Sequence, residues 1–218
     1  MKKLVLVGNA SLNKDMSAFI DASDVVIRFN DARTLGVKSG FKTDILCVRN
    51  TGGPALCFIA NKSVKKYPKF PDLSEVWFPR NGDTFTEYSE KIIESNELCD
   101  VKIRRFSKEL NNKVFEKLVV ISKSEKIYPS SGFLALSYIL ETSEFDQYEK
   151  YIVGFTFDMW EGHPAKAERI LVETYCKQYK DLHFIPVTHY NRIRRIIKDS
   201  KLYAILRYIK GKITNCSL

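Results

Sequence analysis

The chain has 218 residues, of which 44% are hydrophobic, and a formal net charge of +9 at pH 7. This length supports one sizeable core, and no apolar run approaches the ~20 residues of a membrane span, which argues against an integral membrane protein. Five cysteines without a Cys-x-x-Cys pair, and an N-terminus without a signal-peptide pattern, argue against a disulfide framework or a metal site and predict a cytoplasmic protein.

The opening stretch predicts the ligand-binding edge of an α/β sheet. Residues 4–7 form an apolar run that ends in Gly8 and Asn9, and residues 25–29 form a second run that ends in Asn30. Such runs are typical of buried parallel strands, and a glycine at the strand end lets backbone N–H groups approach a ligand. Carboxamides at one sheet edge suit a nucleotide base or ribose, whereas ordinary turn formation is the alternative for each asparagine.

The middle of the chain alternates between short apolar runs and amphipathic stretches. We expect further strands at 43–48, 75–79, 101–106 and 151–155, helices at 84–96 and 107–118, a loop at 49–54 and irregular structure at 61–75. This alternation predicts an α/β fold, a single Rossmann-like domain with a mostly parallel sheet flanked by helices. The domain is expected to span residues 1–190.

A Pro-Ser-Ser-Gly sequence comes directly before an apolar helical pattern. Ser130 and Ser131, followed by Gly132, stand where the serines can cap the first turn of that helix. The exposed N–H groups of such a turn suit a phosphate, while a plain N-cap is the commoner use of serine there.

His163 and Pro164 precede another amphipathic stretch. Proline suits the first helical position, so His163 is expected at a helix N-terminus, where the local positive potential keeps imidazole neutral. That position suits a general base, although a structural role is commoner for a lone histidine.

The C-terminal segment, residues 191–218, carries eight Lys or Arg against one Asp, which places most of the net charge there. Isoleucines and leucines alternate with these charges at helical spacing. This pattern is typical of attachment to an anionic membrane surface, and the alternative is an apolar stripe that closes the core.

Taken together, these stretches resemble the eukaryotic-type sialyltransferase family and, more loosely, bacterial sialyltransferases of similar fold. The segments similar to its large, small and very small motifs are Val7-Gly8-Asn9 with Ile20-Asp21, 24–30 and 40–43; 128–136 with 153–155; and His163 with Glu168. Three motifs in one order, each in the expected strand-loop-helix context, make a combined signal that no single one gives.

The resemblance implies a variant of the GT-A glycosyltransferase fold and an inverting transferase that needs no metal or cofactor. Its donor would be a CMP-activated acidic sugar, sialic acid or Kdo, and its acceptor a hydroxyl of a glycan or lipid-linked glycan, as in lipopolysaccharide or capsule. By position, His163 would be the catalytic base. The donor would contact Gly8, Asn9, Asn30, Ser130, Ser131 and Gly132, and Arg28, Tyr128 and Glu168 would support the site.

The family's third motif is nearly absent, so the resemblance does not identify the group that stabilises the leaving phosphate. Tyr128 and His189 are candidates for this role. A dehydrogenase is disfavoured because the G-x-G-x-x-G fingerprint is missing. The alternative to an enzyme is a nucleotide- or RNA-binding α/β module that uses the basic tail. We expect no nucleic-acid partner, because the charge is confined to one end of the chain.

Overall fold

The structure is a computed structural model, and it describes residues 1–36, 38–61, 70–81, 85–157 and 162–187. The chain divides into two compact units, Met1–Pro186 and Val187–Leu218. The predicted membrane-contact segment 191–218 and His189 lie outside the described residues. Among the helices described, none combines the length and the apolar character needed to cross a membrane.

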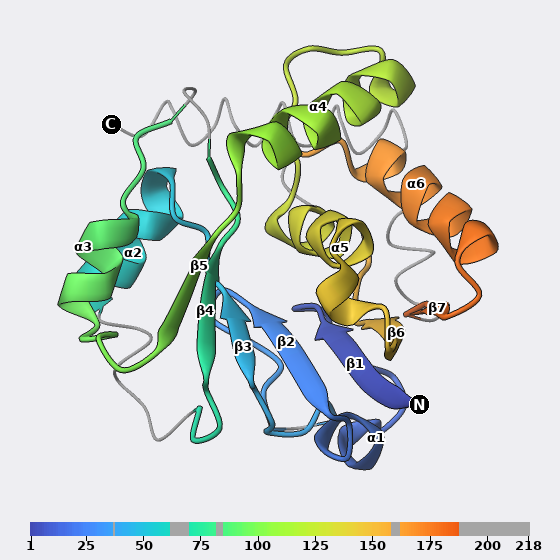
Figure 1. The fold of residues 1–218 in the computed structure, drawn as a ribbon, viewed down its shortest axis with the longest axis horizontal. Coiled ribbons are helices and arrows are strands. Elements are labelled where there is room, and N and C mark those ends of the chain that lie inside the picture. Colours follow the sequence, from blue (N-terminus) through green and yellow to red (C-terminus); the bar gives the residue numbers. More distant parts are fainter. Residues whose placement is uncertain (37, 62–69, 82–84, 158–161, 188–218) are drawn as a thin grey trace, which may run out of the picture. The chain divides into compact units, whose positions relative to one another are not determined.

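The first unit is built on one parallel sheet of seven strands in the order β5-β4-β3-β2-β1-β6-β7 (Figure 1). The strands are β1 (Lys2–Val7), β2 (Val25–Phe29), β3 (Ile45–Cys47), β4 (Glu75–Phe78), β5 (Lys102–Arg105), β6 (Tyr148–Val153) and β7 (Leu182–Ile185). Strands β1 to β5 extend the sheet in one direction, after which the chain returns and adds β6 on the other side of β1. This reversal makes the space between β1 and β6 the topological switch point of the sheet.

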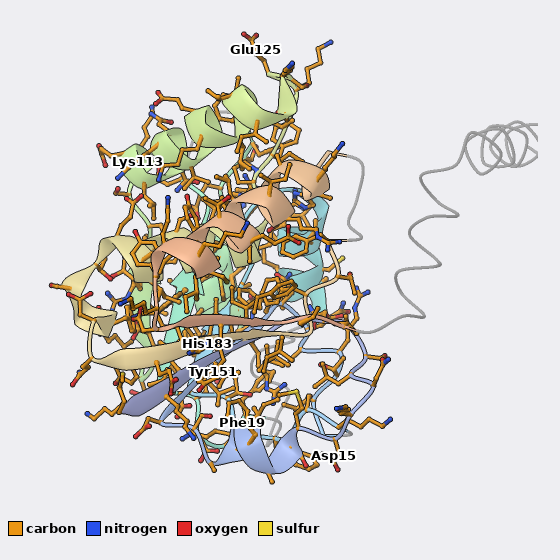
Figure 2. The ribbon with its side chains drawn as sticks, turned by 90° about the vertical axis from the view of Figure 1, so that its right-hand side faces the viewer. Asp15, Phe19, Lys113, Glu125, Tyr151 and His183 are labelled. Carbon is orange, nitrogen blue, oxygen red and sulfur yellow. The ribbon has the colours of Figure 1, made fainter. Side chains whose placement is uncertain are left out.

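Helices cover both faces of the sheet. One face carries α1 (Ser17–Asp21), α2 (Gly52–Asn61) and α3 (Ser89–Ser95), and the other carries α4 (Lys108–Ser122), α5 (Ser131–Glu141) and α6 (Ala165–Gln178). A short 3-10 helix, η1 (Ser143–Phe145), follows α5. Figure 2 shows Phe19 of α1 and Lys113 of α4 on opposite sides of the sheet. The prediction of an α/β domain with a parallel sheet flanked by helices is confirmed.

The alternation of side chains along β1 explains why its sequence is apolar throughout. Leu4 and Leu6 pack into the core beneath α4, α5 and α6, whereas Val5 and Val7 pack against Ile20 of α1 on the opposite face. A strand buried on both faces has no solvent side for polar residues, so its apolar run is continuous. The same sheet places the ends of β1, β2, β3 and β6 at one edge.

The elements α1, α2, η1 and β7 were not predicted from the sequence. The helix α2 begins inside the stretch expected to be a loop, 49–54, and ends where irregular structure was expected to begin, at residue 61. The glycines and proline at the start of α2 disfavour a helix interior, but they stand in its first turn, where they are tolerated. Ala55 and Phe58 then pack into the core with Ile92 of α3, so tertiary packing decides the helix.

Candidate active site

A cavity of about 890 Å³ opens at the carboxyl edge of the sheet, at the switch point between β1 and β6. We call it the switch-point cavity. Its wall comes from the ends of four strands, from α2, from the start of α5 and from the segment before α6. It includes all six residues predicted to bind the donor, together with the predicted base His163. Ligands of open α/β sheets bind in this position.

The floor of the cavity depends on a close approach between two strand ends. The Gly8 N–H donates to the Val153 carbonyl at 2.8 Å, and the Ala10 N–H donates to the Gly154 carbonyl at 3.1 Å. A Cβ atom on Gly8 would lie 2.3 Å from the Gly154 carbonyl oxygen. Since no side chain fits there, the glycine at the end of β1 joins β1 to β6 and keeps the switch point open to a ligand.

Asparagines tie neighbouring strand ends together along this edge. The Asn9 Nδ2 donates to the Phe29 carbonyl at 3.0 Å, and the Asn30 Oδ1 accepts from the Arg49 N–H at 2.9 Å. Asn50 continues the series after β3, where its carboxamide bonds to both the N–H and the carbonyl of Arg80. Asn9 and Asn30 therefore line the cavity while their carboxamides hold the backbone, which accounts for their presence without any ligand.

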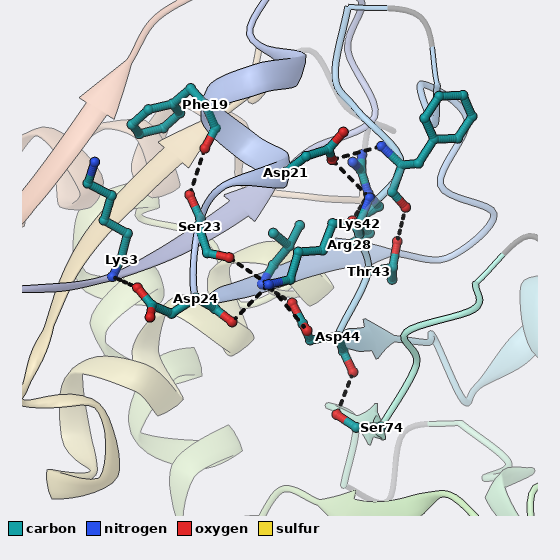
Figure 3. Close-up of polar contacts among 12 residues, drawn as sticks. Lys3, Phe19, Asp21, Ser23, Asp24, Arg28, Lys42, Thr43, Asp44 and Ser74 are labelled. Atoms are coloured by element: carbon teal, nitrogen blue, oxygen red, sulfur yellow. Dashed lines mark hydrogen bonds and ion pairs between the residues drawn. The ribbon is translucent and has the colours of Figure 1, made fainter.

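Arg28 does not line the cavity. Its side chain is 1% exposed and donates to the carbonyls of Ser39, Gly40 and Lys42 and to the Ser39 hydroxyl. Asp21 accepts from the N–H groups of Phe41 and Lys42 in the same loop (Figure 3). The segment that resembles the large motif thus holds the loop between β2 and β3 in place.

Glu168 is buried, 1% exposed, and bonds to the N-terminus of α5. Its carboxylate accepts from the Ser130 N–H at 2.6 Å and from the Ser130 hydroxyl at 2.7 Å. The Ser130 hydroxyl in turn caps α5 by accepting from the Phe133 N–H at 3.1 Å. Glu168, expected to support the site, thus orients the first turn of α5. Burial raises the pKa of Glu168 to about 7, against the lowering effect of its bonds to Ser130.

His163 stands two residues before α6 and lines the cavity. Its Nδ1 lies 2.6 Å from the Tyr128 carbonyl oxygen, an acceptor that fixes the Nδ1–H tautomer. Burial lowers the pKa of His163, the bond to Tyr128 opposes this, and the charges of Arg80 and Arg49 lower the pKa further. The ring is therefore neutral at pH 7, with its basic lone pair on Nε2, as a general base requires.

Arg49 and Arg80 are residues of the site that the sequence prediction missed. Arg49 follows β3 and lines the cavity, and Arg80 follows β4 and donates to the Pro129 carbonyl. Both lie just after a buried strand, as Asn9 and Asn30 do, so the same sequence signal would have indicated them. Their charges give this end of the cavity a positive potential.

The donor atoms for a metal are not gathered here. In the part of the chain that the structure describes, no group of three or more His, Cys, Asp or Glu side chains could hold a metal ion. The polar groups of the cavity are instead amides, hydroxyls, a thiol, an imidazole, two guanidinium groups and the carboxylate of Asp31, together with the N-terminal ends of α2 and α5. Helix N-termini and guanidinium groups favour an anionic ligand.

Comparisons with known proteins give a fold and a relative that point in different directions. No protein-family model matches the chain. The urease operon 23 kDa accessory protein of Rhizobium meliloti (strain 1021) is 29% identical over 193 residues, which cover 80% of this chain and 89% of that protein. Two solved structures share the fold at lower identity.

The first solved structure is a mammalian sialyltransferase in complex with Gal-beta-1-3GalNAc-ortho-nitrophenol, with a TM-score of 0.51, 18% identity and coverage of 84% of this chain and 69% of that chain. The second is the sialyltransferase CstII from Campylobacter jejuni in complex with the substrate analogue CMP-3FNeuAc, with a TM-score of 0.52, 15% identity and coverage of 86% and 81%. These identities establish similarity of fold alone.

The family resemblance drawn from the sequence motifs is therefore corrected. The relative with the higher identity carries the name of a urease accessory protein, and the sialyltransferases share only the fold. Part of the physical reason lies in Asn9, Arg28 and Asp21, whose side chains bond to the backbone around β1, β2 and the loop after β2. Residues that stabilise a common fold can match between proteins that differ in function.

Proposed function

We infer that the chain is a glycosyltransferase that moves a sugar from a CMP-activated donor to an acceptor hydroxyl. The observation that carries this proposal is His163, a neutral imidazole with a fixed tautomer at the wall of the switch-point cavity. Similarity in fold to sialyltransferases supports it, because one of them is in complex with a CMP-sugar analogue. The proposed chemistry itself is inferred from the residues of the site, since a shared fold does not determine function.

In the proposed reaction, His163 Nε2 accepts the proton of the acceptor hydroxyl. The acceptor oxygen forms a bond to the anomeric carbon while the bond from that carbon to the phosphate oxygen breaks. The bonding electron pair leaves with CMP, and attack from the opposite side inverts the anomeric centre. A base positioned in this way contributes roughly 10²–10⁴-fold in rate.

The finer features of the proposal come from the sequence. The donor sugar would be an acidic one, sialic acid or Kdo, and the acceptor a glycan or lipid-linked glycan of lipopolysaccharide or capsule. We propose that no metal takes part, so that activity persists in excess EDTA. Residues 191–218 would keep the enzyme at an anionic membrane surface, which co-sedimentation with anionic vesicles would test.

The first experiment measures CMP binding by calorimetry in three proteins. Gly53 lines the cavity, and a Cβ atom there would meet no described atom within 4 Å beyond its own helix and chain neighbours. Gly53→Trp therefore places an indole at the cavity wall without a clash at its base. Leu56 is 49% exposed on the same helix and is not among the lining residues, so Leu56→Trp is the matched control. We expect CMP to bind the wild type and Leu56→Trp alike and to bind Gly53→Trp much more weakly.

A transfer assay with CMP-sialic acid and CMP-Kdo then tests the reaction itself. Formation of a glycoside that depends on His163 would support the transferase. Absence of CMP binding by the wild type would contradict the donor, and equal binding to all three proteins would contradict the location. Hydrolysis of the CMP-sugar without transfer would agree with the proposed donor but contradict transfer to an acceptor hydroxyl.

A second candidate function follows from the relative that is 29% identical over most of its length. A non-enzymatic accessory role, with a nucleotide bound only as a ligand, would not require a general base. In that case His163→Gln would retain full biological function. Complementation of a strain that lacks the gene, by wild type and by His163→Gln, separates the two candidates.

A further inference from the structure

The charges around the switch-point cavity do not balance. Among its described lining residues, the charged side chains are Asp31, Arg33 and Arg49. Asp31 and Arg33 form an ion pair with a 2.7 Å separation between Oδ2 and Nε, and the Arg33 side chain is 74% exposed. Arg49 forms no ion pair with any described residue, so its charge is the one that the cavity wall leaves uncompensated.

Arg49 and Arg80 also share one guanidinium nitrogen that makes no hydrogen bond within the described chain. The Nε atoms of both are buried, and neither has a hydrogen-bond partner within the described chain. Burial lowers the pKa of Arg49 and lowers that of Arg80 to about 10, where the Arg49 charge adds to the effect. Glu168 is near enough to act on Arg80, but its two oxygens are bonded to Ser130. Both arginines are partly buried, and a partly buried guanidinium group without a paired carboxylate gains from a ligand that supplies the negative charge.

The backbone holds both arginines in fixed positions. Asn30 accepts from the Arg49 N–H, and Asn50 bonds to the N–H and carbonyl of Arg80. Each side chain therefore starts from a strand end tied to its neighbour, which limits how far the guanidinium groups can move. The same two charges act on His163, so an anion held by Arg49 would lie near the imidazole.

We propose that Arg49, with Arg80 behind it, forms the phosphate subsite of the switch-point cavity and stabilises the charge on the departing CMP. The assignment rests on the proposed function, because CMP is the ligand whose phosphate is meant. As the bond between the anomeric carbon and the phosphate oxygen breaks, the electron pair stays on that oxygen, and a guanidinium N–H donor meets it. Arg49 would thus stabilise the leaving phosphate, the role for which the shortened third motif supplies no residue.

The test compares CMP with cytidine, which differs only in the phosphate, by calorimetry on four proteins. Arg49→Gln removes the charge, Arg49→Lys keeps the charge but not the planar group, and Arg105→Gln removes the same charge from the end of β5, where Arg105 pairs with the exposed Glu90. We expect Arg49→Gln to weaken CMP binding about 10- to 100-fold while cytidine binding stays unchanged. Arg49→Lys should fall between, and Arg105→Gln should match the wild type.

Other outcomes contradict the proposal in distinguishable ways. Equal weakening of CMP and cytidine by Arg49→Gln would assign Arg49 a structural role and leave the transferase intact. Equal weakening by Arg105→Gln would reduce the effect to net charge. Absence of CMP binding by the wild type would overturn the proposed donor and the phosphate subsite together. Because the Nε of Arg49 has no hydrogen-bond partner among the described residues, Arg49→Gln should unfold at the wild-type temperature or above, which thermal unfolding checks.

Discussion

From β1 to the loop after β2, polar side chains are bonded to the backbone. From the end of β3 to the start of α6, by contrast, ionisable side chains are buried or partly buried and have shifted pKa values. Asn9, Asp21 and Arg28 exemplify the first group, which we call the bonded segment, residues 9–44. Arg49, Arg80, His163 and Glu168 form the second, which we call the charged wall.

The difference separates residues that stabilise the fold from residues that can react. Polar groups whose hydrogen bonds are all made within the protein gain little from a ligand, because they would have to give up one partner for another. Groups with shifted pKa values and orphaned donors are unfavourable in the empty site and gain from a ligand. We therefore expect substitutions in the charged wall to change chemistry and those in the bonded segment to change stability.

The largest effect is expected from His163→Gln. Loss of the general base should lower kcat for sugar transfer by about 10²–10⁴-fold, or roughly 3–5 kcal/mol, with little change in CMP affinity. His183→Gln is the matched control, since His183 pairs with Glu149 between β6 and β7 and does not line the cavity. An equal loss of kcat in both variants would contradict the role of the charged wall.

The pH dependence of transfer activity in the wild type also tests whether His163 is the general base. Because burial and two nearby arginines lower the pKa of His163 from its ordinary 6.5, the base is protonated only at lower pH. Transfer activity should therefore decline on acidification with a midpoint below pH 6.5. A midpoint above pH 6.5 would mean that the pKa of His163 is not lowered, and activity that rises as the pH falls would mean that the neutral imidazole is not the catalytic form.

Arg28→Met should have the next largest effect, and it should act on stability. The substitution leaves the carbonyls of Ser39, Gly40 and Lys42 without their donor in a buried setting. We expect a loss of about 3 kcal/mol in the free energy of unfolding, partly offset by removal of a buried charge. Urea denaturation measures it, and the exposed Arg33→Met should change stability by less than about 0.5 kcal/mol. Comparable losses in the two variants would mean that the buried bonds of Arg28 to the backbone carry no special share of the stability.

The contrast also explains how much of the site could be predicted from the sequence. The apolar runs and the residues after them indicated β1, β2 and the edge at which Asn9 and Asn30 meet, because strand polarity alone brings strand ends together. The sequence does not indicate which polar side chains form their hydrogen bonds with the backbone. That depends on the loop between β2 and β3 folding back onto Arg28, a contact across 11 to 14 residues. The incomplete pairing of Arg49 and Arg80 likewise depends on what packs around them.

The pH dependence of the free energy of unfolding should report the raised pKa of Glu168. Its folded pKa of about 7 lies above the ordinary 4.5, so between these values the folded protein keeps a proton that the unfolded chain has lost. The contribution of this group to the free energy of unfolding therefore falls as the pH rises from 4.5 to 7, by about 3 kcal/mol.

Glu168→Gln should be less stable throughout, because it offers a single acceptor oxygen to Ser130, but the fall specific to Glu168 should vanish. Urea denaturation of both proteins from pH 4.5 to 8 measures the difference, in which the contribution of His163 cancels. A constant difference between the two proteins across this range would mean that Glu168 is ionised throughout and that its burial does not perturb it.

Asn9→Ala should have the smallest effect. It tests most directly whether a residue of the bonded segment that also lines the cavity takes part in ligand binding. The substitution removes the bonds to the Phe29 carbonyl and from the Arg33 N–H, but Asn9 is exposed, so water can replace them. We expect a loss of about 1 kcal/mol in stability by urea denaturation and little change in CMP affinity by calorimetry. If CMP affinity falls at least tenfold while stability is unchanged, Asn9 is a ligand-binding residue, and the bonded segment takes part in recognition as well as in holding the strands together.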